Sequence, residues 1–249
     1  MHSIQIRPAM FARRYCFLLG LLFARSAAAV ILIGAEVPPF VLSTAGGSGL
    51  AVEILQEAAR RLNEPTAVQV MPFARALAVT KQGVDILLAP PGRVASRESS
   101  YQWVAPLVDE VFVLISSKQF QPKPLVRNQL ESLTIGVMRN SVGEGLAAGL
   151  FINSIEVVPM EVTNAKKLAT GRIGAWVASW NTALHAQREA GLDVQDLVRG
   201  EVLMRTTLYV AASLKMSPQN VQRWRVVLEK MRKDGSIEAI EKKYNYQSP

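Results

Sequence analysis

The chain has 249 residues, of which 28 are Lys or Arg and 20 are Asp or Glu, so its formal net charge is +8. Hydrophobic residues make up 49% of it, which favours a packed globular protein over a disordered one. One cysteine and two histidines exclude a disulfide framework and a His/Cys metal cluster. The sequence therefore predicts neither a metal nor a cofactor.

Residues 1–29 have the pattern of a secretion signal peptide. An apolar stretch, YCFLLGLLFA, precedes Ala27 and Ala29, which fit an A-x-A cleavage site. It is too short for a membrane anchor, which needs about 20 residues. We expect the mature chain to begin near Val30 and to reside in the periplasm. A positive n-region precedes the apolar stretch, formed by Arg7, Arg13 and Arg14.

Removal of this segment changes what the charge implies. It holds four basic residues and no acid, so 24 basic and 20 acidic residues remain, a net charge of +4. The remaining basic residues have no interleaved aromatics, so we expect no nucleic-acid binding. Cys16 leaves with the signal, which excludes a thiol nucleophile, and His185 is then the single histidine left.

The first half of the mature chain alternates strand-like and helix-like patterns. Strand-helix-strand order of this kind predicts parallel pairing with right-handed crossovers. The stretch over 111–120, VFVLISSKQF, then leads into a polar, proline-containing connector. The patterns predict strands over 30–37, 67–73 and 84–90 and helices over 49–63 and 74–83.

The second half repeats this order and indicates a second lobe. A strand over 206–213 precedes a long helix over 217–235, with Ser217 as its N-cap, and a short segment over 236–245. We expect two α/β lobes joined near residues 113–122, with ligands beyond the carboxyl ends of the strands. The lobe 2 patterns predict strands over 133–140, 155–160 and 174–179 and helices over 141–150, 164–171 and 181–191. The lobes would comprise 30–116 plus 209–249 (lobe 1) and 117–208 (lobe 2).

Five segments carry a resemblance to a known family: EVPPF, GLAVEILQEAARRLN, VDILLAPPGRVASRESSYQWVAPL, LTIGVMRNSVGEG and GRIGAWVASWNTAL. In order and spacing, the chain resembles the bacterial extracellular solute-binding proteins of family 3, the amino-acid-type receptors of ABC importers. This resemblance spans essentially the whole mature chain. It implies a two-lobed periplasmic-binding-protein type II fold, with a small-molecule ligand in the cleft between the lobes. It further implies a monomer whose partner is an inner-membrane ABC permease.

Arg97 stands in the loop after the third predicted strand. The family's loop usually reads Thr-Pro-Glu-Arg, whose Arg grips the ligand's α-carboxylate, and residues 94–97 match it here as Val-Ala-Ser-Arg. A guanidinium suits this role because it donates a two-pronged hydrogen bond to a carboxylate. Pro91 of the same loop joins the predicted site. The alternative is a surface arginine paired with Glu98 or Asp109.

Ser141 and Val142 open a predicted helix of lobe 2, where free backbone N–H groups attract negative charge. The resemblance implies that a small hydroxyl residue here meets the same carboxylate. The S-x-x-E spacing of Ser141 and Glu144 equally predicts a capping box. Both roles can hold at once.

Some positions depart from the family's pattern. The acidic residue that pairs with the ligand's α-ammonium falls at Ser179 here, Gly174 stands where many relatives have Asp, and the loop Thr is Val94. Without these acceptors a buried ammonium is costly to desolvate, which favours a less cationic carboxylate as the ligand. Glu36, at the end of the first strand, is the predicted substitute charge, while Glu53 on the first helix is expected to be solvated.

Three aromatic residues are predicted to line the cleft: Phe40, Phe73 and Trp180. They stand at loop positions that such folds turn toward the ligand. Packing in the core is the alternative for each, since aromatic side chains dominate core energetics.

The predicted function is capture of a small carboxylate-bearing or amino-acid-like solute for an ABC importer, without catalysis. A second hypothesis is a periplasmic sensor that reports its ligand to a membrane signalling protein. A third follows from relatives of this fold that act as dehydratases on cyclic carboxylates, and it assigns Glu36 as the acid.

Overall fold

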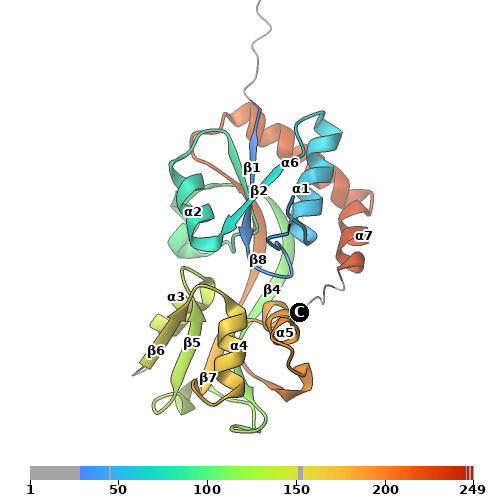
Figure 1. Ribbon diagram of the computed structural model, residues 1–249. Helices are drawn as coiled ribbons and strands as arrows, with labels where there is room; N and C mark the ends of the chain where they lie inside the picture. Colours follow the sequence, from blue (N-terminus) through green and yellow to red (C-terminus); the bar gives the residue numbers. More distant parts are fainter. Residues whose placement is uncertain (1–28, 45, 151–153, 245, 247, 249) are drawn as a thin grey trace, which may run out of the picture.

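The computed structural model describes residues 29–249 except 45, 151–153, 245, 247 and 249. The predicted signal peptide therefore lies outside the described residues, apart from Ala29. One eight-stranded sheet runs through two lobes in the order β2-β1-β3-β8-β4-β7-β5-β6 (Figure 1). Across the part of the chain that is described, no helix combines the length and the apolar character that a membrane span requires.

Lobe 1 is a three-layered unit. Its strands β1, β2 and β3 pair in parallel, as the strand-helix-strand order predicts. Helices α1, α6 and α7 cover one face of the sheet and α2 covers the other (Figure 1). The elements are β1 (Ile31–Glu36), α1 (Leu50–Leu62), β2 (Val68–Pro72), α2 (Phe73–Gln82), β3 (Ile86–Ala89), α6 (Pro218–Lys233) and α7 (Ser236–Lys243).

Lobe 2 repeats this plan with three parallel strands, β5 lying between β6 and β7. Helix α4 begins three residues before the predicted start at 164, which brings Glu161 into its first turn. The elements are β5 (Thr134–Met138), α3 (Val142–Ala148), β6 (Ser154–Val158), α4 (Glu161–Ala169), β7 (Ala175–Ser179) and α5 (Trp180–Glu189). Three short 3₁₀ turns complete the set: η1 (Ala95–Ser100), η2 (Arg127–Gln129) and η3 (Val194–Asp196).

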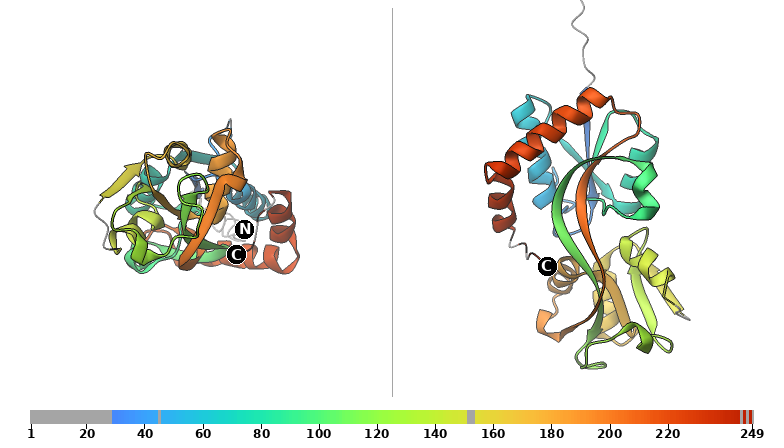
Figure 2. Two further views of the ribbon diagram at one scale, coloured as in Figure 1. Left: turned by 90° about the horizontal axis from the view of Figure 1, so that it is seen from below. Right: turned by 180° about the vertical axis from the view of Figure 1, so that it is seen from behind.

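Two long antiparallel strands, β4 (Gln102–Ser117) and β8 (Leu197–Ala212), join the lobes (Figure 2, right). In lobe 1, β8 pairs with β3, and in lobe 2, β4 pairs with β7. The apolar runs predicted only parts of these strands, because charged residues such as Glu110 and Arg205 interrupt the rest. The expected lobe boundaries fall inside both strands, so each strand is shared between the lobes.

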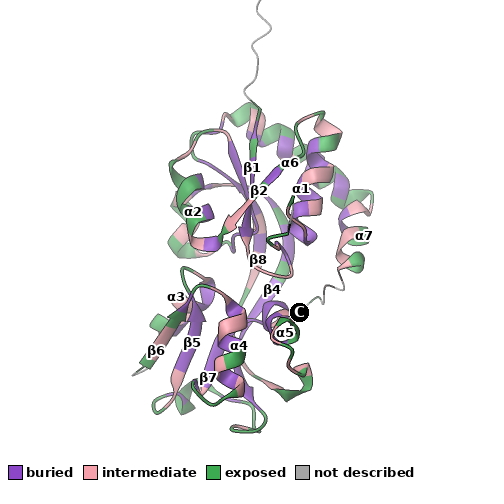
Figure 3. Ribbon diagram, viewed as in Figure 1, coloured by how far each residue is buried: buried purple, intermediate pink, exposed green. Residues whose placement is uncertain are grey.

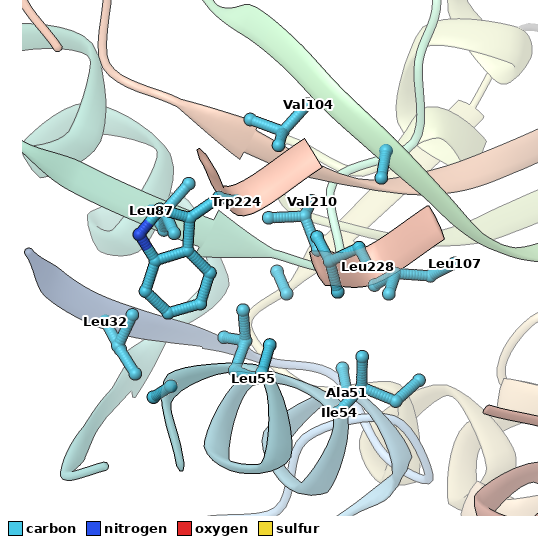
Figure 4. Close-up of a cluster of buried hydrophobic side chains, with 14 of the residues drawn as sticks. Leu32, Ala51, Ile54, Leu55, Leu87, Val104, Leu107, Val210, Trp224 and Leu228 are labelled. Atoms are coloured by element: carbon cyan, nitrogen blue, oxygen red, sulfur yellow. The ribbon is translucent and has the colours of Figure 1, made fainter. Parts of the chain in front are cut away.

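The largest buried cluster lies in lobe 1 between α1, α6 and the sheet (Figure 3). Trp224 of α6 is 0% exposed and packs among leucines of β1, α1 and β3 (Figure 4). The start of α6 agrees with the prediction, since Ser217 Oγ accepts a hydrogen bond of 3.2 Å from the Asn220 N–H. This cap and this apolar face attach the C-terminal helices to lobe 1.

Replacing Trp224 with alanine is expected to destabilise the protein by about 3–5 kcal/mol, because it leaves a large cavity in this cluster. Val226→Ala is the matched control: it lies on the same helix but is 52% exposed, so we expect a change within about 0.5 kcal/mol. The free energy of unfolding in urea measures both effects. Equal losses in the two variants would show that α6 does not bury its Trp224 face as described.

Candidate functional site

A cavity lies where the two lobes meet. Its walls come from the β-strand ends and loops of lobe 1, from the helix starts of lobe 2 and from the two shared strands. Its volume is about 40 Å³, far below the 300–1,000 Å³ usual for pockets that hold drug-sized ligands. The solute is therefore small, or the lobes separate to admit it. The lining residues are Val37, Phe40, Phe73, Pro90, Gly92, Arg97, Phe112, Met138, Ser141, Val142, Glu161, Ser179, Thr182 and Leu208.

Six of the nine sequence-predicted site residues line this cavity: Phe40, Phe73, Arg97, Ser141, Val142 and Ser179. They come from both lobes, and the fold alone brings them together. Ligand contact by any of them stays a prediction.

The other three, Glu36, Pro91 and Trp180, are not among the lining residues. Glu36 ends β1, and it is the next residue, Val37, that lines the cavity. Pro91 is buried, and its carbonyl oxygen accepts a hydrogen bond of 3.0 Å from Tyr209 N–H. In each case a sequence neighbour lines the cavity instead: Val37 next to Glu36, and Pro90 and Gly92 on either side of Pro91.

Trp180 packs inside lobe 2. Its ring is partly buried against the cluster formed by α4, α5 and β7, and the Arg199 guanidinium lies 5.6 Å from the ring centroid. Trp180 is the first residue of α5, which begins one residue earlier than the pattern predicted, and its contact with Arg199 is a contact with β8.

The Arg97 guanidinium lies at the mouth between the lobes. Its Nη1 donates to the Gly92 carbonyl of its own loop (3.3 Å) and its Nη2 to the Asn140 carbonyl of lobe 2 (2.5 Å). The Phe73 ring centroid is 5.7 Å from its Cζ. Burial lowers the pKa of Arg97, which means that the charge is poorly solvated and gains from a nearby anion.

Arg93, in the same loop, is the arginine that pairs at the surface. Its guanidinium binds Glu98 through two contacts of 3.0 and 2.5 Å and stacks on the rings of Trp103 and Tyr209. The alternative of a surface ion pair between Arg97 and Glu98 is therefore wrong. Asp109, the other suggested partner, instead accepts a hydrogen bond from Thr207.

The start of α3 shows half of the predicted capping box. Ser141 Oγ accepts a hydrogen bond of 3.1 Å from the Glu144 N–H. The Glu144 side chain returns to the N–H of Asn140, one residue before the cap, instead of to Ser141. The cap uses a lone pair of Ser141 Oγ and does not occupy its hydroxyl proton, so capping and ligand contact are compatible.

Ser179, where the family's acidic residue falls, is buried at the start of α5. Its hydroxyl donates a hydrogen bond of 2.9 Å to Thr182 Oγ1, and it lies beside the Glu110 carboxyl of β4. Burial raises the pKa of Glu110 from 4.5 to about 7, although Asn181 and Ser179 stabilise the carboxylate. Glu110 lies behind the cavity wall and is not among the lining residues.

Glu161 is the site residue that sequence reasoning missed. It is the first residue of α4, it is 6% exposed, and it lines the cavity. Its Oε2 accepts hydrogen bonds from Trp176 Nε1 (2.8 Å) and Asn164 Nδ2 (2.7 Å). Burial raises its pKa from 4.5 to about 7. The available signal was its place directly after a predicted strand, since ligand sites lie beyond the carboxyl ends of strands.

The site has the composition of a binding cleft. Among the lining residues, Arg97 is the one cation and Glu161 the one acid, and three hydroxyls and an apolar wall complete the set. No group of three or more His, Cys, Asp or Glu side chains suited to a metal occurs within the described residues. The arrangement can hold a small polar solute through charge and hydrogen bonds.

The family model of the bacterial extracellular solute-binding proteins, family 3, matches residues 30–247. The chain belongs to this family. The two-lobed shape, the interlobe cavity and the arginine loop all agree with this membership. The family's extracellular character supports an exported protein.

Solved structures confirm the fold. A histidine kinase sensor domain with similarity to periplasmic binding proteins matches with a TM-score of 0.77 and 17% identity, covering 88% of this chain and 98% of that one. A mutant of ArgBP from T. maritima matches at 0.76 and 19% identity, covering 88% and 96%. The solute receptors for L-cysteine of Neisseria gonorrhoeae match at 0.73 and 18% identity, covering 86% and 89%. No curated protein sequence matches the chain significantly.

The buried carboxyls predict how stability depends on pH. The folded-state pKa values of Glu110 and Glu161, about 7, lie above the ordinary 4.5. The stability that each contributes is therefore full below about pH 4.5 and is lost as the pH rises through about 7. The loss is roughly 3 kcal/mol for each group at most. Urea unfolding of the apo protein between pH 4 and pH 8 measures it.

Glu161→Gln and Glu110→Gln should each flatten this profile. Asp196→Asn, which removes an exposed acid of lobe 2, is the matched control and should leave the profile unchanged. A profile that is flat in the unmodified protein would show that these carboxyls ionise freely in the fold.

Proposed function

We propose that the protein captures a small carboxylate-bearing or amino-acid-like solute in the periplasm and delivers it to an ABC importer of the inner membrane. The observation that carries this proposal is the place of Arg97. Its guanidinium lines the interlobe cavity and donates hydrogen bonds to carbonyl oxygens on both sides of it. A carboxylate is a stronger acceptor than either carbonyl.

Capture and lobe closure would then be one event. A ligand carboxylate could replace the Asn140 carbonyl as the acceptor of the Arg97 Nη2 hydrogen bond. It would then contact Arg97 of lobe 1 and the Ser141 hydroxyl of lobe 2 at the same time. Such a ligand binds the closed arrangement better than an open one and so shifts the population toward closure. Its carboxylate would stand in for the direct contact between the lobes.

The shared strands are the proposed hinge. Between the lobe-specific pairings of β8 with β3 and of β4 with β7, these strands pair with each other, and β8 adds one bridge to the arginine loop, between Leu208 and Gly92. The register of β4 against β8 shifts between Pro106 and Val108, which marks an irregular ladder in this stretch. Hinge motions are absorbed by a few residues at such element boundaries.

A sensor role is the second candidate, because the sensor domain of a histidine kinase matches the whole length of the fold. Uptake of labelled solute by cells with and without the gene separates the two roles. Loss of uptake on deletion supports the importer receptor, whereas intact uptake with a lost transcriptional response supports the sensor.

Catalysis has less support. Glu36, the acid that the dehydratase hypothesis assigned, does not line the cavity, and the chain belongs to a family of solute-binding proteins. We expect no turnover of prephenate-like cyclic carboxylates. A measurable rate with the mature chain would contradict this expectation.

A thermal-shift screen of the mature chain against amino acids, polyamines, dicarboxylates and opines identifies the ligand class. A ligand at a hundredfold excess over its dissociation constant stabilises the protein by about 2.7 kcal/mol. The proposal predicts that only compounds with a carboxylate raise the melting temperature. Stabilisation by polyamines alone would contradict it.

Arg97→Ala should weaken binding of the ligand found in the screen by at least about 30-fold, because its carboxylate would lose a charged hydrogen-bond partner in the cleft. The melting temperature of the apo protein should change little. Arg93→Ala is the matched control, since Arg93 lies in the same loop but pairs at the surface with Glu98. Intact binding with a large loss of stability in Arg97→Ala would make Arg97 structural.

A further inference from the structure

We propose that Glu161 is the cation subsite of the cleft: its carboxylate receives the protonated amine of a ligand whose carboxylate lies on Arg97. This inference rests on the proposed function, because it takes Arg97 as the acid-binding group. It assigns specificity to a residue of α4, whereas the family's acidic position is occupied by Ser179. It also replaces the sequence-based expectation of a ligand without strong positive charge.

The position of Glu161 supports this role. The residue begins α4, with two residues between it and the end of β6, so its side chain reaches the cavity from lobe 2, while Arg97 reaches it from lobe 1. It is 6% exposed, and it is the one acid among the lining residues of the described chain. A carboxyl this deeply buried is rare unless it has a partner.

The carboxyl is held rigidly through one oxygen. Trp176 Nε1 and Asn164 Nδ2 both donate to Oε2, and no donor among the described residues reaches Oε1. The Asn164 side chain packs closely against the backbone of Gly136. A Cβ atom added to this glycine would lie only 2.6 Å from Asn164 Oδ1, so the packing leaves the amide little room to move. Oε1 is thus a preorganised acceptor, which lowers the cost of binding a donor.

The two charges of the cavity are separate. The structure records no ion pair between Arg97 and Glu161, both of which lie within its described part, and neither charge cancels the other. Burial raises the pKa of Glu161 to about 7, because its carboxylate lacks a cation in a poorly solvated site. An ammonium would supply that cation, and in such surroundings the attraction is much stronger than in water.

The complementary ligand is a short zwitterion. Its carboxylate would meet Arg97, its primary amine would meet Glu161, and its small apolar body would lie against Phe40, Phe73 and Phe112. The hydroxyls of the cavity leave room for further hydrogen bonds. This chemistry distinguishes amino acids, α or otherwise, from plain carboxylic acids.

Isothermal titration calorimetry on the mature chain tests the inference with matched probes. The proteinogenic amino acids, β-alanine and γ-aminobutyrate are each compared with the analogue that lacks the amine, such as propionate for L-alanine. We expect the best amine-bearing probe to bind about 10- to 100-fold tighter than its analogue, as expected for a hydrogen bond to a charged group. Glu161→Gln should remove this preference and change the affinity for the amine-free analogue less than about threefold.

Glu161→Gln is nearly isosteric and keeps an acceptor for the Trp176 N–H. Glu189→Gln removes an exposed acid from the same lobe and should leave the amine preference intact. If acids bind through Arg97 but the amine preference is absent, or survives Glu161→Gln, the inference fails and the proposed function stands. If no probe of either kind binds at millimolar concentration, both fail.

A second measurement on the unmodified protein does not depend on the variant. The indole N–H of Trp176 donates to the Glu161 carboxyl, so its NMR signal reports the state of that group. Adding the amine-bearing probe should shift this signal, and adding the amine-free analogue should not. Trp176→Phe assigns the signal among the four tryptophans of the chain. Equal responses to both probes would overturn the inference.

Discussion

The antiparallel pairing of β4 with β8 is the interaction on which the rest of the structure depends. Each strand has 16 residues and belongs to both lobes, so a single hydrogen-bonded ladder joins two otherwise separate sheets. Because the connection is double, the lobes can change their angle but cannot drift apart. The cavity between them lies beside this ladder, and Phe112 and Leu208 of the two strands form part of its wall.

The site follows from this arrangement. In both lobes, parallel strands end toward the gap, and the loops and helix starts that follow them carry the polar groups. The lobes also share packing, since Met138 of β5 belongs to the same buried cluster as Phe73 and Ile33 of lobe 1. Contacts of this kind stabilise the closed arrangement of the lobes. The hydrogen bond from Arg97 to the Asn140 carbonyl is the one that a stronger acceptor, such as a carboxylate, can replace.

The electrostatics give the cleft its character. Two opposite charges, Arg97 and Glu161, are partly or fully buried in it without touching each other, and each is incompletely satisfied by neutral groups. Buried charges are costly unless they are paired. A cavity with two such groups favours a ligand that carries both opposite charges, because only such a ligand pairs with both groups. The unfavourable burial of the two charges thus makes binding selective for that kind of ligand. Glu110, buried behind Ser179, is a second buried carboxyl, whose ionisation affects stability without facing the cavity.

The sequence by itself determined the elements of both lobes, their parallel pairing and the arginine loop, because these depend on local periodicity and on a recognisable order of segments. Six of the nine site residues predicted from it line the cavity. Only the tertiary structure decided the full length of β4 and β8, whose mixed polar and apolar residues show no continuous apolar run. The tertiary structure also decided which residues at the strand ends and helix starts line the cavity. Glu36, Pro91 and Trp180 each stand one residue from Val37, Gly92 and Ser179, which line the cavity in their place, and Glu161 lines it at the start of α4. Such one-residue differences change which face a residue occupies, and packing between distant segments sets them.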